Sequence, residues 1–287
     1  MLEQIRRVGV LSCSLSGCAI ARVIALGGYD VHLCEVSHAT LEAAFRNTSS
    51  FFKRQAMRGR ISAAAAHAAI QHMHGSAEMH DLAACQLVIE AMPQSPEAKI
   101  NTFRLLDHIC PPATIFLSHL SALAVLPLAT ATKRPERVAG VHFIHPVHLV
   151  KIVERVRTSM VAPAIIETLV QFMTSLQREA IVVADAPGLV VNRLLIAYLL
   201  QAIRLVEAGV ASQADIDKAM HLGCGYPMGP FTLMDALGLD QVCYLAERIY
   251  ETSQDAAYLP PETLKRLVAA GHYGKHTGQG FYTYPDI

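Results

Sequence analysis

The N-terminal segment carries the pattern that most restricts the fold of this chain. A short apolar run at residues 8–11 is followed by a turn of small residues, a helical pattern at 19–26 and a second apolar run at 30–34. Strand-length apolar runs joined through a helical segment are typical of a βαβ unit. Parallel strands need such a crossover, so the pattern predicts a parallel sheet covered by helices.

The alternation of strands and helices continues to about residue 185 and then stops. Further strands are predicted at residues 86–91, 113–117, 138–143 and 180–183, and helices at 98–109 and 161–177. Residues 41–70 are rich in alanine with a break at 58–60, which predicts a helical hairpin. We therefore expect an α/β fold: a Rossmann-like, doubly wound parallel sheet at residues 1–185, followed by an all-helical C-terminal domain at 186–287.

Composition narrows the classes of partner. The chain holds 24 basic and 24 acidic residues without a basic tract, which argues against a nucleic-acid or anionic-membrane partner. The apolar stretch at 189–206 contains Asn192, Arg193, Gln201 and Arg204, so we expect a buried helix and no membrane span. Seven scattered cysteines without a CxxC pair fit a reducing cytoplasm. The expected partner is a small molecule or a protein.

The turn after the first strand reads Ser12-Cys13-Ser14-Leu15-Ser16-Gly17. A dinucleotide-binding turn uses three glycines, and only the third, Gly17, is present here. Ser14 places a Cβ where phosphate would approach the main chain, although the helix N-terminus still offers N–H groups. Glu35 ends the second strand and favours NAD, because a carboxylate accepts from a ribose 2′-hydroxyl and repels a 2′-phosphate. The residues alone leave an ordinary βαβ turn with an exposed acid equally open.

Six blocks along the rest of the chain carry a resemblance to a known family. They are VIEA at 88–91, RPERVAGVHF at 134–143, KIVE at 151–154, DAPGLVVNR at 185–193, GYPMGP at 225–230 and TGQGFY at 277–282. In order and spacing these blocks resemble the 3-hydroxyacyl-CoA dehydrogenases. The resemblance extends over nearly the whole chain.

The resemblance implies a catalytic site with residues from both domains. His142 matches the family's general base for the 3-hydroxyl group, and Glu154 matches the glutamate that orients the imidazole. A carboxylate suits this role because it fixes the tautomer of a histidine and stabilises the imidazolium. Ser121 and Asn192 match the residues that hold the substrate oxygen.

The same resemblance implies NAD as the cofactor and a basic contact to CoA. The cofactor positions are Ser12, Ser14, Gly17, Glu35, Gln94 and Lys99. Arg58, with Lys53, Arg54 and Arg60 nearby, matches the family's contact to the CoA phosphates, which arginine binds with two parallel hydrogen bonds. A solvated basic helix face explains these four residues equally well.

Departures from the family pattern gather on the cofactor side. Besides the turn, Gln94 replaces an acidic residue, His119 and His145 replace asparagines, and His276 replaces a lysine. Two functions fit this chain. One is NAD-dependent interconversion of 3-hydroxyacyl and 3-oxoacyl thioesters of CoA or a carrier protein. The other is an NAD-independent acyl-thioester-binding protein or acid/base enzyme. For either function we expect a homodimer formed through the C-terminal domain.

His142, His145 and His148 recur at intervals that also invite a metal site. This segment is predicted to run from strand to loop through Pro146, so the three side chains do not share a helix face. No carboxylate or thiolate completes a familiar ligand set with them. We therefore expect no bound metal.

Overall fold

The computed structural model describes residues 5–92, 95–120 and 123–284. The chain divides into two compact units, one up to Asp185 and one from Ala186 onward. Each unit has a hydrophobic core of its own. The two are described separately below.

The first unit is built on an eight-stranded sheet with the order β3-β2-β1-β4-β5-β6-β7-β8. The strands are β1 (Arg7–Leu11), β2 (Asp30–Cys34), β3 (Met73–Ser76), β4 (Leu87–Glu90), β5 (Ile115–His119), β6 (Val138–Phe143), β7 (Ile152–Arg157) and β8 (Glu179–Ala184). Strands β1 to β6 are parallel, in the order of a dinucleotide-binding sheet. The Rossmann-like prediction is confirmed for this part.

Two strands were missed by the sequence patterns. β3 is short and reads Met-His-Gly-Ser, which lacks an apolar run. β7 contains Glu154, Arg155 and Arg157 among its valines and pairs antiparallel with β6. The sheet is therefore mixed, since β7 and β8 run opposite to the other strands.

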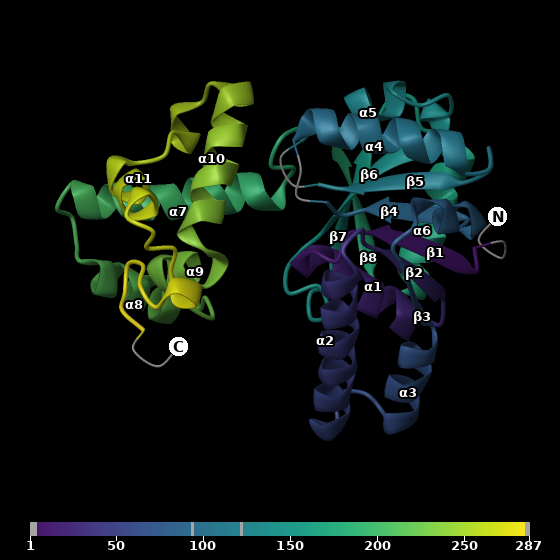
Figure 1. Cartoon of the computed structure of the whole chain (residues 1–287). Helices are drawn as coiled ribbons and strands as arrows, with labels where there is room; N and C mark the ends of the chain where they lie inside the picture. The colour runs from purple at the N-terminus through teal and green to yellow at the C-terminus, as the bar shows by residue number, and fades with distance from the viewer. Residues whose placement is uncertain (1–4, 93–94, 121–122, 285–287) are drawn as a thin grey trace. The chain divides into compact units, whose positions relative to one another are not determined.

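Helices cover both faces of this sheet. They are α1 (Leu15–Leu26), α2 (His38–Met57), α3 (Ala63–Gln71), α4 (Pro96–Ile109), α5 (Leu126–Thr130) and α6 (Pro163–Ser175), with short 3₁₀ turns η2 (Met79–Ala84) and η3 (Pro135–Arg137). The predicted hairpin is confirmed: α2 and α3 run side by side away from the sheet (Figure 1). The break falls at Gly59, whose φ of +67° is readily adopted by glycine.

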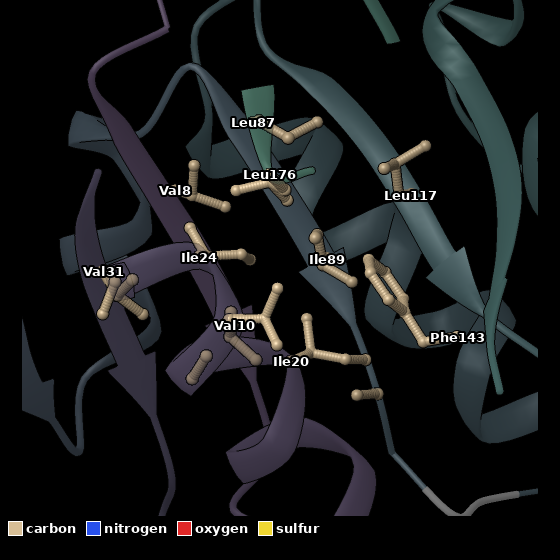
Figure 2. Close-up of a cluster of buried hydrophobic side chains, with 14 of the residues drawn as sticks. Val8, Val10, Ile20, Ile24, Val31, Leu87, Ile89, Leu117, Phe143 and Leu176 are labelled. Carbon is tan, nitrogen blue, oxygen red and sulfur yellow. The ribbon is translucent and has the colours of Figure 1, made fainter. Parts of the chain in front are cut away.

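The core of this unit lies where α1 and α6 pack on the strands. Figure 2 shows Ile20 and Ile24 of α1, with Leu176 just past α6, against Val8, Val10, Leu87, Ile89, Leu117 and Phe143 of the sheet. Burying one such side chain contributes about 1.5–3 kcal/mol. This core fixes the carboxyl ends of β1, β2 and β4, between which the turn of residues 12–17 lies.

The second unit is helical, as predicted. Its helices are α7 (Val191–Glu207), α8 (Gln213–Cys224), α9 (Pro230–Leu237), α10 (Leu239–Ser253) and α11 (Glu262–Ala269), with η4 (Ala256–Tyr258) and η5 (Lys275–Thr277). The apolar stretch at 189–206 forms α7, whose Leu199 and Leu200 are fully buried. None of the described helices combines the length and apolarity that a membrane crossing requires.

Two buried carboxylates organise this unit. Asp235 is fully buried and accepts hydrogen bonds from the N–H groups of Phe281 and Tyr282 and from the hydroxyl of Tyr284. A Cβ on Gly280 would lie 2.1 Å from the Asp235 Oδ1 atom, so only glycine fits there. The TGQGFY block is therefore explained by packing around Asp235.

The GYPMGP block has a matching explanation. The Asp217 carboxylate accepts from the N–H groups of Phe231 and Thr232 at the start of α9, and from the Tyr282 hydroxyl. A Cβ on Gly229 would lie 2.3 Å from the Asp217 Cα atom. Both blocks thus support the fold of the second unit.

Candidate active site

His142 and Glu154 form a buried pair at the junction of β6 and β7. They face each other in the antiparallel register, and directly opposed residues project from the same face of a sheet. The His142 Nδ1 atom lies 2.6 Å from the Glu154 Oε2 atom. Glu154 is fully buried and His142 is 7% exposed, so little water competes for this contact. The arrangement holds the imidazole in one orientation beside a carboxylate.

A second imidazole stacks on His142. His119, at the end of β5, lies 5.8 Å from it between ring centroids, with 23° between the planes. Burial holds the pKa of His119 well below its usual value, and the neighbouring charges of His142 and Lys99 lower it further. The N–H of Phe143 approaches the His119 Nδ1 atom at 3.4 Å, which suits a neutral ring. His119 is therefore an uncharged neighbour of the pair.

The turn between β1 and α1 satisfies most of its own N–H groups. The N–H of Cys13 donates to the Glu35 carboxylate, that of Ser14 to the Ser12 Oγ atom, and that of Gly17 to the Ser14 Oγ atom. Ser14 also caps α1 and donates its hydroxyl to the Ala91 carbonyl. The serines thus occupy amides that a glycine-rich turn leaves free for a ligand.

Two features of a dinucleotide-binding turn persist. Ser12 has a φ of +97°, a conformation that favours glycine and costs on the order of 1–3 kcal/mol in other residues. A Cβ on Gly17 would lie 2.1 Å from the Ser12 carbonyl oxygen, so this glycine is required for close packing. The main chain therefore retains the path of a glycine turn despite the serines.

The turn also retains room for phosphate at the start of α1. Among the described residues, the N–H groups of Leu15 and Ser16 have no hydrogen-bond partner. They lie in the first turn of a 12-residue helix, where free amides and the helix dipole attract anions. The site thus fits a dinucleotide pyrophosphate, held by fewer amides than three glycines would allow. One Glu35 oxygen is bound to Cys13, and the other remains for a ribose hydroxyl.

Lys99 has a structural partner. Its ammonium is buried and lies 2.7 and 2.8 Å from the two oxygens of Glu90, a fully buried carboxylate at the end of β4. Glu90 also accepts from the Ser118 hydroxyl and the N–H of Met92. The lysine therefore ties α4 to the strand ends beside the turn. Sequence reasoning did not assign Glu90, although a charged residue that ends an apolar run was a visible signal.

The remaining predicted residues are placed as follows. Arg58 is exposed at the C-terminal cap of α2, with Lys53, Arg54 and Arg60 also exposed. Asn192 lies in the first turn of α7 in the second unit and is partly exposed. Ser121 and Gln94 lie outside the described residues. Within the described part of the chain, no group of three or more His, Cys, Asp or Glu residues could hold a metal ion.

Comparisons with known proteins agree with this architecture. Residues 7–186 match the NAD-binding domain of 3-hydroxyacyl-CoA dehydrogenase, and residues 188–284 match its C-terminal domain. The chain belongs to the 3-hydroxyacyl-CoA dehydrogenase family. Its predicted membership and its NAD cofactor are thereby confirmed, and the chain is an enzyme of this NAD-dependent type.

Relatives match over their full length. The chain is 37% identical to a 3-hydroxybutyryl-CoA dehydrogenase of Mycobacterium tuberculosis over 99% of this chain and 100% of that protein. It is 36% identical to the human mitochondrial hydroxyacyl-coenzyme A dehydrogenase over 98% of this chain and 91% of that one. The crystal structure of M. tuberculosis FadB2 matches with a TM-score of 0.95 at 37% identity, covering 98% of this chain and 99% of that one.

Proposed function

We propose that this dehydrogenase interconverts 3-hydroxyacyl-CoA and 3-oxoacyl-CoA thioesters, with His142 as the general base and a short acyl chain as substrate. The observation that carries the proposal is the buried His142–Glu154 pair inside a domain that matches the family's NAD-binding domain. The short acyl chain is suggested by the relatives named 3-hydroxybutyryl-CoA dehydrogenase.

The pair supports proton transfer at one defined atom. With Nδ1 directed at the Glu154 carboxylate, the neutral His142 ring carries its proton there and Nε2 is left to accept one. In the oxidation direction Nε2 would take the proton of the 3-hydroxyl group, and the Glu154 charge would stabilise the imidazolium that forms. Bound NAD supplies the acceptor for the hydride from the same carbon. In reduction His142 returns the proton.

Other residues complete the proposal. Ser121 and Asn192 would hold the substrate oxygen, and Arg58 the CoA phosphates, with Lys53, Arg54 and Arg60 adding positive charge nearby. Glu35, Ser12, Ser14, Gly17, Gln94 and Lys99 form the cofactor side, where Lys99 acts through Glu90. We propose a CoA thioester in preference to a carrier protein. We also propose a homodimer in the cytoplasm, where seven unpaired cysteines are stable.

The test combines binding and turnover. We expect NADH to bind with a Kd in the micromolar range, about −8 kcal/mol. We also expect oxidation of NADH at 340 nm when acetoacetyl-CoA is added. The His142→Gln variant should lower kcat about 10²–10⁴-fold with little change in KM, because it removes the base and keeps the binding groups. The matched control is His67→Asn, an exposed histidine on α3.

Two results would contradict the proposal. If NADH did not bind to folded protein, the NAD-independent function would take its place, and His142 would serve acid/base chemistry without a hydride acceptor. If NADH bound and His142→Gln turned over normally, the base would be another residue.

A further inference from the structure

The loop after β6 contacts the cofactor turn through a histidine. His145 lies three residues beyond His142, and its Nε2 atom is 3.0 Å from the Ser16 Oγ atom in the first turn of α1. Ser16 is also one of the two residues whose N–H groups have no partner within the described ranges. An anion bound by the Ser16 amide would therefore lie within one residue of the His145 ring. The ring is exposed, so a ligand can reach it.

The surroundings of His145 are basic or neutral. The titratable groups that face it are His142 on β6, His148 on its own loop and His119 on β5. The nearby carboxylates are already engaged, Glu154 with His142 and Glu35 with the Cys13 amide. Within the described chain no carboxylate lies within ion-pair distance of His145. A protonated His145 thus has no counterion of its own.

We propose that His145, together with the free amides of Leu15 and Ser16, binds the cofactor's pyrophosphate, and that it takes up a proton when NAD or NADH binds. The inference rests on the proposed function, because it assumes that the cofactor occupies this turn. It assigns to a side chain the role that the missing glycine amides play in a glycine-rich turn.

The electrostatics give the sign of the coupling. In the free protein, partial loss of water around the ring and the like charges of His142 and His148 lower the pKa of His145, so the ring is largely neutral near pH 7. The negative charges of a pyrophosphate beside the ring favour the imidazolium and raise the pKa in the complex. Cofactor affinity is then higher below the pKa of the complex and falls as the pH rises through it.

The experiment is calorimetric titration with NADH from pH 6 to 8.5, in buffers of different ionisation enthalpy, which counts the protons taken up. For the natural chain we expect net proton uptake near pH 7 and an affinity that falls by up to about tenfold per pH unit. His145→Asn and His145→Gln should bind NADH more weakly at pH 6 and show little pH dependence. His67→Asn, with its exposed ring on α3, is the matched control and should behave as the natural chain.

Direct observation of the ring removes any dependence on a variant that folds poorly. The carbon-bound proton signal of His145, assigned by its loss in His145→Asn, should titrate at a higher pH with NADH than without it. Equal proton uptake by the natural chain and His145→Asn would overturn the inference and assign the proton to His142 or another group. Uptake caused by CoA alone, and absent with NADH, would overturn it in favour of a substrate phosphate.

The outcomes separate the two proposals. Binding of NADH without proton uptake by His145 defeats only this inference and leaves the dehydrogenase function intact. Absence of NADH binding at every pH defeats both.

Discussion

His142 and His119 are the same residue type in stacked positions, yet their surroundings give them opposite roles. His142 has a carboxylate 2.6 Å from its Nδ1 atom, whereas His119 has burial and like charges around it. A histidine beside a carboxylate gains a stabilised imidazolium, and one in a dry, positive environment stays neutral. The first can exchange a proton during catalysis, and the second contributes shape.

The neutral state of His119 predicts an acid-sensitive stability. Its pKa in the folded chain lies well below the value of about 6.5 expected after unfolding. As the pH falls below about 6.5, the unfolded chain binds a proton that the folded chain does not, so the free energy of unfolding falls until the folded pKa is reached. His119→Asn should reduce this slope by up to about 1.4 kcal/mol per pH unit.

Urea unfolding of both proteins at pH 7.5, 6.5 and 5.5 measures the effect. His145, His148 and His32 also have lowered pKa values and act in the same direction in both proteins, so the difference between the two slopes isolates His119. Identical slopes would show that His119 is protonated in the folded chain.

Glu154 gives a second prediction for a single side chain. Glu154→Gln keeps the size of the residue and removes the charge that supports the imidazolium. We expect kcat to fall about 10²–10⁴-fold while KM for acetoacetyl-CoA changes little, because substrate binding does not use this carboxylate. Steady-state kinetics at 340 nm measure both constants. An unchanged kcat would limit Glu154 to a structural role.

At the scale of elements, the buried Glu90–Lys99 pair joins β4 to α4. The pair is 0% and 5% exposed in its side chains, and Ser118 of β5 donates to the same carboxylate. A buried carboxylate that loses its counterion is far more costly than a surface one. The ends of β4 and β5, beside the cofactor turn, depend on this network for their position.

Removing the ammonium tests this dependence. Lys99→Met should lower the free energy of unfolding by about 3–5 kcal/mol, because Glu90 remains buried without its partner. The double variant Glu90→Gln, Lys99→Met should be less destabilised than Lys99→Met alone, since no unpaired charge remains. Lys53→Met, at an exposed position on α2, is the control. Urea unfolding at pH 7.5 decides. A loss no larger than that of Lys53→Met would mean that Glu90 takes up a proton or finds another partner.

At the scale of the whole molecule, exposed apolar residues on the second unit favour self-association. Leu194, Leu222 and Val210 are 71%, 68% and 66% exposed. Large apolar side chains exposed together on a monomer often mark an interface. A contact between two copies of the second unit would cover them.

Light scattering coupled to size-exclusion chromatography tests the homodimer. We expect twice the chain mass of 31.2 kDa for the natural protein. Leu194→Glu should shift the mass toward the monomer, because it places a charge on the apolar face of α7. Met57→Glu is the control at a comparably exposed position of the first unit, where Met57 is 87% exposed. Dimers of equal strength for both variants would place the interface elsewhere.

The sequence by itself determined the elements whose residues repeat with a clear period. The apolar runs at β1, β2, β4, β5 and β6, the break at Gly59 and the amphipathic α7 were predictable, because local burial imposes their patterns. The order of the family blocks likewise predicted His142 and Glu154 as partners, and the structure places them 2.6 Å apart.

Only the tertiary structure decided how the polar residues are used. β7 carries charged residues and shows no strand pattern, but its antiparallel pairing with β6 is what sets Glu154 opposite His142. The bond from His145 to Ser16 joins positions 129 residues apart, and Lys99 finds Glu90 across a helix and a strand. A periodic pattern reports which side of an element is buried. The partner of a polar group depends on distances between elements, and these are fixed only when the whole core packs.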